Sequence, residues 1–231
     1  MKKIDEPMDF PLLLASTVHD IKNTIGLLNN ALGEMVAECN HRECELSSRL
    51  QYLRYEANRL NGNLVQLLTL YKINKSNISL NISHHNVFDF LEENILGNAP
   101  LLDSKKITVE LECPEDLVWF FDRELLSGVV NNILNNAYNY AKDRLKISAC
   151  VKTAALAIRI EDNGKGYPDS MTAASPPGPN RSVNFQSGST GLGLYFAAVI
   201  AAMHKNENKE GSVVISNGSS LGGGCFTIYL P

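Results

Sequence analysis

The chain has 231 residues, 44% of them hydrophobic and 20% charged. This length suits one domain with an appended element, and the apolar share excludes an intrinsically disordered chain. Because 21 basic and 25 acidic residues leave a formal charge of −4, a protein that binds nucleic acid through bulk electrostatic attraction is disfavoured.

The sequence also indicates a cellular compartment. Its longest stretch without charged or strongly polar residues is Gly191–Met203, thirteen residues, and a membrane-spanning helix needs about 20. The first residues lack the apolar core of a secretory signal. Five scattered cysteines favour reduced thiols over a disulfide framework. We therefore expect a cytoplasmic protein that does not insert into a membrane and does not bind nucleic acid.

Two long helices are predicted first, each with apolar residues at alternating spacings of three and four. In the first helix these are Leu14, Val18, Ile21, Ile25, Leu28, Leu32 and Met35. In the second they are Leu46, Leu50, Leu53, Ala57, Leu60, Leu64, Leu67 and Tyr71. A short polar connection makes consecutive helices antiparallel neighbours, so residues 10–74 are predicted to form a hairpin. Two helices cannot enclose a core, and a dimer that forms a four-helix bundle is expected.

The connection between these helices holds Cys39, His41 and Cys44. A structural zinc site needs four ligands, and no second cluster of such residues lies nearby in the sequence. A helical corner that happens to contain these side chains is therefore favoured over a metal site.

Beyond a Ser- and Asn-rich linker, residues 75–85, helices and strands follow each other irregularly. Helices are predicted over Asn86–Leu96, Glu124–Ala141 and Gly191–Met203. Strands are predicted over Ile107–Leu111, Leu117–Phe121, Lys146–Val151, Leu156–Glu161, Val213–Ser216 and Phe226–Leu230. The segment Pro168–Gly188 is a loop too long for a simple connector. This order predicts an α+β sandwich rather than a doubly wound sheet.

A histidine with polar neighbours stands on the first helix, in the motif His19-Asp20-Ile21-Lys22-Asn23. His19 lies about 100° round the helix from the seam residue before it, and Asn23 lies one turn further along the same face. Asp20 could accept a proton from the imidazole. These features suit a nucleophilic histidine, and the alternative on this motif alone is an ordinary exposed histidine.

A run of asparagines stands in the helix predicted over Glu124–Ala141. Asn132 and Asn136 share one helix face, and Asn139 lies three residues further on. Asparagine is a poor helix former, so a run of them requires a reason. Amide oxygens are hard ligands suited to Mg²⁺ with nucleotide phosphates, and a polar surface stripe is the alternative.

Two glycine-rich motifs follow. In Asp162-Asn163-Gly164-Lys165-Gly166 the two glycines permit a tight turn, and the aspartate at a strand end can accept a hydrogen bond from an amino group. In the segment 188–194, Gly191 and Gly193 open an apolar helix, whose first N–H groups are free for a phosphate. Neither segment matches a P-loop or a dinucleotide-binding motif.

Together and in this order, the motifs resemble those of two-component sensor histidine kinases. HDIKN resembles the phosphoacceptor box, NNILNNAYNYA the asparagine box, and EDNGKGYP and GSTGLGLYFAAVIAAMH the two glycine boxes. The resemblance covers nearly all of residues 12–231. It implies a dimerisation and phosphoacceptor hairpin over residues 1–74, the linker 75–85, and an ATP-binding domain of the Bergerat (GHKL) type over residues 86–231.

The resemblance implies a protein histidine kinase that uses ATP and Mg²⁺. His19 would accept the γ-phosphoryl group with Asp20 as general base, and would pass it to an aspartate of a response-regulator receiver domain. Asn23 would help to remove phosphate from that aspartate. The implied nucleotide-binding residues are Asn132, Asn136, Asn139, Asp162, Gly164, Gly166, Gly191 and Gly193, with Asn132 and Asn136 as Mg²⁺ ligands and residues 168–188 as a lid.

The sequence departs from the family pattern at several points. Thr24 replaces the usual proline after the phosphoacceptor box, and Asn139 stands where many members have a basic residue. Only about eleven residues precede the first helix, so either a separate sensor protein supplies the input or the chain is part of a longer one.

Two other functions share parts of this pattern. A histidine phosphotransferase on a kinase-like scaffold would keep the hairpin without using ATP, but it would lose the nucleotide-binding residues. A serine kinase that inhibits a sigma factor shares the ATP fold but lacks a hairpin with a heptad seam. Binding of a magnesium nucleotide discriminates the first of these from a kinase.

Overall fold

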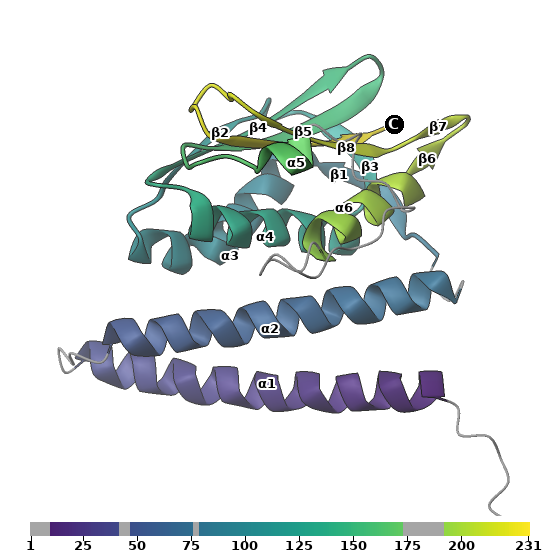
Figure 1. Ribbon diagram of the computed structural model, residues 1–231. Helices are drawn as coiled ribbons and strands as arrows, with labels where there is room; N and C mark the ends of the chain where they lie inside the picture. The colour runs from purple at the N-terminus through teal and green to yellow at the C-terminus, as the bar shows by residue number, and fades with distance from the viewer. Residues whose placement is uncertain (1–9, 42–46, 76–78, 173–191) are drawn as a thin grey trace, which may run out of the picture. The chain divides into compact units, whose positions relative to one another are not determined.

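A computed structural model divides the chain into two compact units, Met1–Lys75 and Ser76–Pro231 (Figure 1). The structure describes residues 10–41, 47–75, 79–172 and 192–231. Within these ranges, the side chains of residues 10–20, 37–41, 47–49, 51 and 170 lie outside the description. Among the helices described, none has the length and apolar character needed to cross a membrane.

The first unit is an antiparallel pair of helices, α1 (Phe10–His41) and α2 (Ser47–Asn74), which pack along each other (Figure 1). The predicted hairpin is confirmed. Leu32 in α1 and Ala57 in α2 are buried, 8% and 4% exposed, and both belong to the predicted heptad pattern.

Alternate heptad positions, among those whose side chains are described, form a second, exposed stripe on each helix. The stripe residues are Ile21, Leu28 and Met35 on α1 and Leu53, Leu60 and Leu67 on α2, each between 42% and 53% exposed. They recur every seven residues, so on each helix they lie along one side. A single hairpin therefore buries only part of its apolar surface, and the two stripes are available to a partner.

The second unit contains a five-stranded mixed sheet with helices on one face (Figure 1). Its strands, in spatial order, are β2 (Thr108–Glu112), β4 (Arg144–Lys152), β5 (Ala155–Asp162), β9 (Gly224–Leu230) and β8 (Ser212–Asn217). Strands β2 and β4 are parallel and the other pairs antiparallel. The helices are α3 (Val87–Ser104), α4 (Arg123–Tyr140) and α6 (Leu192–Met203). The predicted α+β sandwich is confirmed.

The core of this unit lies between the sheet and the three helices. Ile147 and Ile158, on neighbouring strands, are fully buried, as the period-2 alternation of a half-covered sheet predicts. Helix α6 is apolar all round, which is typical of a buried helix. Each of its residues from Phe196 to Ala201 is buried. Full burial of each large aliphatic side chain contributes about 1.5–3 kcal/mol.

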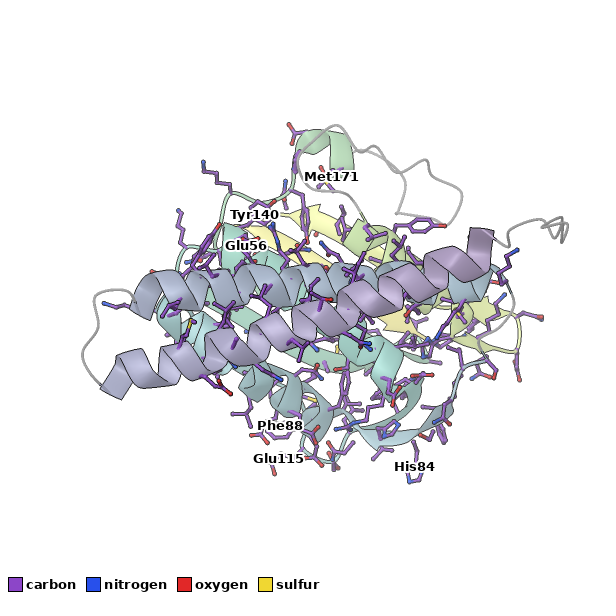
Figure 2. All side chains as sticks on the ribbon, turned by 90° about the horizontal axis from the view of Figure 1, so that it is seen from below. Glu56, His84, Phe88, Glu115, Tyr140 and Met171 are labelled. Carbon is purple, nitrogen blue, oxygen red and sulfur yellow. The ribbon has the colours of Figure 1, made fainter. Side chains whose placement is uncertain are left out.

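A second, two-stranded sheet begins inside the segment that the sequence indicated as a linker. Strand β1 (Ile82–Asn86) pairs antiparallel with β3 (Val118–Asp122), so residues 82–85 are not a connector. Figure 2 labels His84 on β1 and Glu115 in the loop before β3. The sequence of β1 is mostly polar, and only pairing with the apolar β3 makes it a strand. Asn86 then caps α3, because its Oδ1 accepts a hydrogen bond from the Asp89 N–H at 2.9 Å.

Two further segments differ from the sequence prediction. Helix α3 continues past Leu96 to Ser104 with Pro100 inside it, because Leu102, 2% exposed, anchors the last turn in the core. Between α6 and β8, strands β6 (Lys205–Asn206) and β7 (Lys209–Glu210) form a short hairpin. The short helix α5 (Asp169–Thr172) begins within the predicted lid, and residues 173–188 of that lid lie outside the described residues.

His204 joins the end of α6 to the start of α4. Its Nε2 accepts a hydrogen bond from the Asp122 N–H at 3.0 Å, and its Nδ1 donates to the Ile200 carbonyl at 2.8 Å. Asp122 caps α4 by accepting from the Leu125 N–H. These contacts require a neutral ring, and burial lowers the pKa of His204 below its ordinary value of 6.5.

We expect the free energy of unfolding to fall as the pH is lowered below the unfolded-state pKa of His204. In that window the unfolded chain binds a proton that the folded chain excludes, so the stabilisation is complete at higher pH. As the pH falls from the unfolded-state pKa to the folded-state pKa of His204, this stabilisation decreases by up to about 1.4 kcal/mol per pH unit. Urea unfolding at a series of pH values should show a smaller decline for His204→Gln than for the wild type. Identical declines would contradict the assignment.

Candidate functional site

The structure brings three of the four predicted motifs together around helix α4. The asparagine face of α4 contacts the first turn of α6, and the end of α4 contacts the turn that follows β5. The fourth motif lies on α1, in the other unit, and is described separately below.

Asn132 packs directly against the first turn of α6. A Cβ added to Gly193 would lie 2.2 Å from Nδ2 and 2.4 Å from Oδ1 of Asn132, which is closer than real atoms approach. One turn before Asn132 on α4, a Cβ on Gly128 would lie 3.4 Å from the ring of Phe196, which is about one turn after Gly193 on α6. Gly193 is therefore required for the close approach of the two helices at the predicted phosphate end.

The amide of Asn132 fits a role in binding a ligand. Its Nδ2 is buried and, in the part of the chain that the structure describes, has no hydrogen-bond partner. An unpaired buried donor costs about 1–3 kcal/mol, so a bound phosphate oxygen would remove that cost. The first N–H groups of α6 lie beside it and suit an anion. The residues present therefore fit a magnesium nucleotide, whose metal ion would take the amide oxygen.

The other predicted residues of this helix differ in their surroundings. Asn136 lies one turn after Asn132 and is half-buried. Asn139 is exposed, and its Nδ2 donates to the Asn135 carbonyl at 3.2 Å, so its amide is bonded to the preceding turn. Described His, Cys, Asp and Glu side chains form no group of three or more that could hold a metal ion.

Asn131 belongs to a different face of α4. Its Oδ1 accepts a hydrogen bond from Asn98 at 2.6 Å, and its Nδ2 donates to the Ser127 hydroxyl at 3.3 Å. The Ser127 hydroxyl donates to Asn94, also on α3. These bonds form a polar ladder between α3 and α4, so the asparagine run serves two faces. One face holds α3, and Asn132 lies about 100° away from it.

Asp162 is held at the end of β5 by glycine backbone. Its Oδ1 accepts hydrogen bonds from the N–H groups of Gly164 at 2.7 Å and Gly224 at 3.3 Å. A Cβ on Gly223 would lie 2.5 Å from the same oxygen. The carboxylate is therefore fixed in direction, as a group that reads one polar atom of a ligand must be.

The turn after Asp162 requires both of its glycines. A Cβ on Gly164 would lie 2.1 Å from the Tyr140 carbonyl oxygen at the end of α4. Gly166 has a φ of +75°, which favours glycine. Asn217, at the end of β8, accepts from the Tyr167 N–H and donates to the Tyr167 carbonyl, both at 2.7 Å, and so fixes the far side of the turn.

The structure adds residues to this site that the sequence did not assign. Tyr140, labelled in Figure 2, is 61% exposed beside the turn. Burial, and then the nearby Asp162 carboxylate, raises the pKa of Tyr167, so its phenol stays protonated at neutral pH. Asn217 could have been suspected from the Asn-Gly pair that ends β8. The place of Tyr167 beside Asp162 has no comparable local signal.

Several predicted residues fall outside this site or outside the description. His19 and Asp20 lie within α1, but their side chains are among those not described. Asn23 lies on the same helix and is exposed. Gly191 is outside the described residues, and the first described residue of α6 is Leu192.

Comparison with known proteins identifies the second unit. Residues 121–231 match the model of the family described as histidine kinase-, DNA gyrase B-, and HSP90-like ATPase. The sensor histidine kinase CssS of Bacillus subtilis is 23% identical over 195 residues, 84% of this chain and 42% of that protein. The chain spans 14–42% of the length of the first four curated relatives that it matches.

Solved structures share the fold. The Acinetobacter baumannii histidine kinase AdeS matches with a TM-score of 0.60 and 22% identity, over 92% of this chain and 96% of that one. Full-length ShkA in complex with AMPPNP matches with a TM-score of 0.62 and 20% identity, over 96% of this chain and 46% of that one. At these identities, the similarity shows the fold of a helical hairpin followed by a GHKL-type sandwich.

Proposed function

We propose that this chain is an ATP-dependent protein histidine kinase of the two-component type, because residues 121–231 match the shared ATPase family and the chain is similar to sensor histidine kinases over most of its length. It autophosphorylates on His19 and passes the phosphoryl group to an aspartate of a response-regulator receiver domain. The observation that carries the proposal is the buried Asn132 Nδ2, which has no hydrogen-bond partner among the described residues and lies against the first turn of α6.

The residue type at this position favours transfer over hydrolysis. By the family resemblance, relatives of this ATP fold that hydrolyse ATP carry a glutamate general base where Asn132 stands, and the amide of Asn132 cannot accept a proton at neutral pH. The site can therefore hold and orient a nucleotide without supplying the base for attack by water. This chemistry leaves the γ-phosphoryl group to an external nucleophile.

The nucleotide would bind along α4 from the turn after β5 to the first turn of α6. Asp162 would accept a hydrogen bond from the adenine amino group, with Gly164 and Gly166 allowing the backbone to approach the base. Gly193, and by the family resemblance Gly191, would leave N–H groups free for phosphates. Asn132 and Asn136 would hold Mg²⁺, which neutralises phosphate charge when bound.

The transfer step uses the motif on α1. A nitrogen of the neutral His19 imidazole attacks the γ-phosphorus, the bond to the bridging oxygen breaks, and ADP leaves. Asp20 accepts the proton that the ring loses. Asn23, one turn along the helix, orients a water for dephosphorylation of a bound receiver aspartate. These three roles are carried by the family resemblance together with helix geometry.

Dimerisation would complete the hairpin. The exposed heptad stripes of α1 and α2 have the spacing of a helical bundle, and a second copy of the chain would cover them. The receiver domain and a separate sensor protein are the other partners that we propose.

Asp162→Ala should weaken binding of Mg·ATP at least tenfold. The reason is that loss of a charge-assisted hydrogen bond costs about 1.5–3 kcal/mol. Isothermal titration calorimetry on the whole chain measures this, with Asp116→Ala as the control because it removes an exposed carboxylate from another loop. No binding heat for the wild type would favour the phosphotransferase alternative. Unchanged affinity of the variant would contradict the role of Asp162.

Incubation with labelled ATP should give an acid-labile, base-stable phosphoryl adduct, as a phosphorus–nitrogen bond requires. His19→Gln should remove the adduct, and Asp20→Asn should slow its formation about 10²–10⁴-fold without affecting nucleotide binding. Asn23→Ala should spare the adduct and slow receiver dephosphorylation. His84→Gln, at an exposed histidine in the other unit, is the control. Label retained on His19→Gln would refute the phosphoacceptor assignment.

Light scattering at micromolar concentration should find the wild type dimeric and Leu28→Asp monomeric, because the variant would bury an unpaired carboxylate in the bundle. Leu60→Asp should act in the same way. Asn30→Asp adds the same charge at an exposed position of α1 outside the stripe and should remain dimeric. A monomeric wild type, or a dimeric Leu28→Asp, would count against the proposed interface.

A further inference from the structure

The side chain of Asn163 occupies the loop between α4 and β4. Its Oδ1 accepts hydrogen bonds from three successive backbone N–H groups, those of Lys142 at 3.1 Å, Asp143 at 3.2 Å and Arg144 at 3.1 Å. Its Nδ2 donates to the Asp143 carboxylate at 2.6 Å. One amide thus organises the complete turn that leaves α4.

This cluster connects the two ends of the candidate site. Asn163 directly follows Asp162, and the next residue, Gly164, lies against the Tyr140 carbonyl at the end of α4. The Asn163 N–H also donates to the Arg144 carbonyl at 3.3 Å. The position of Asp162 relative to the end of α4 is therefore fixed by hydrogen bonds on both sides of Asn163.

Helix α4 transmits that position to the phosphate end. Asn136 and Asn132 lie one and two turns before Tyr140 on the same continuous helix. At 1.5 Å per residue, the rise from Asn132 to Tyr140 is about 12 Å. A helix of this length does not change its rise easily, so the connection at its end determines how far Asp162 is from the two amides.

We propose that Asn163 is a positioning residue that sets the spacing between Asp162 and the amides of Asn132 and Asn136, so that a single nucleotide engages both. The proposal rests on the proposed function, because it needs a nucleotide that spans the site. Asn163 does not contact the ligand itself. Its loss would leave each end able to bind its own part of the nucleotide but would misalign the two.

The test compares two ligands. Adenosine reports the base end alone, and Mg·ATP reports both ends together. With Asn163→Ala in the whole chain, we expect calorimetric affinity for Mg·ATP to fall at least tenfold and affinity for adenosine to fall less than threefold. Asn208→Ala, at an exposed turn residue of the β6–β7 hairpin, should change neither.

Exchanging the amide of Asn163 with the carboxylate of Asp143 tests whether Mg·ATP affinity can be restored. Asn163→Asp alone places two carboxylates where a 2.6 Å hydrogen bond now exists, and it should weaken Mg·ATP binding as strongly as Asn163→Ala. The double variant Asn163→Asp/Asp143→Asn restores one amide and one carboxylate in reversed order, and we expect its Mg·ATP affinity to return to within threefold of the wild type. This rescue decides the question even if Asn163→Ala does not fold.

The outcomes separate the two hypotheses. Equal weakening of adenosine and Mg·ATP, no weakening of either, or failure of the exchange to restore affinity would overturn the role of Asn163 while leaving ATP binding intact. A wild type that binds no Mg·ATP would instead refute the proposed function, and the positioning role with it.

Discussion

The close approach of backbone and side chain around α4 is the constraint on which the second unit depends. At one end of the helix, Asn132 leaves no room for a Cβ on Gly193, and at the other end the Tyr140 carbonyl leaves none on Gly164. A methyl group at either place would have to displace backbone or a packed amide, and overpacking of this kind costs about 1–3 kcal/mol. Gly193 and Gly164 are thus packing requirements first, because they allow α4 to pack closely against α6 and against the turn after β5.

This packing gives the asparagine-rich helix two separate tasks. Its residue Asn131 bonds to α3 through side-chain amides, while Asn132, on the adjacent face, keeps a buried nitrogen that finds no partner among the described residues. Buried polar groups are normally paired within the protein. The face of Asn131, whose hydrogen bonds are made within the protein, stabilises the domain. The face of Asn132 is the one where a ligand could supply the missing hydrogen bond.

The hairpin shows a similar division, because one chain buries some of its apolar heptad positions and leaves others exposed to a partner. Among the heptad positions whose side chains are described, alternate ones are buried or half-buried within the hairpin, and the others stay about half exposed on both helices. The alternation of three and four residues was enough to predict the helices and their pairing. It could not assign each position to the inner or the outer stripe, because both stripes have the same period of seven.

The sequence by itself predicted the helical hairpin, the α+β sandwich with the strands of its main sheet, and the motifs, because periodicity and glycine placement are local properties of a chain. It could not show that the polar segment 82–86 is a strand or that α3 passes Pro100, since a partner strand and a buried Leu102 decide these from outside the segment. Only the tertiary structure distinguished Asn131 from Asn132 and connected Asn163 to the turn after α4. The bond between Asn98 and Asn131 joins residues 33 positions apart, and the bonds of Asn163 join residues about 20 positions apart. No local pattern encodes contacts at such separations.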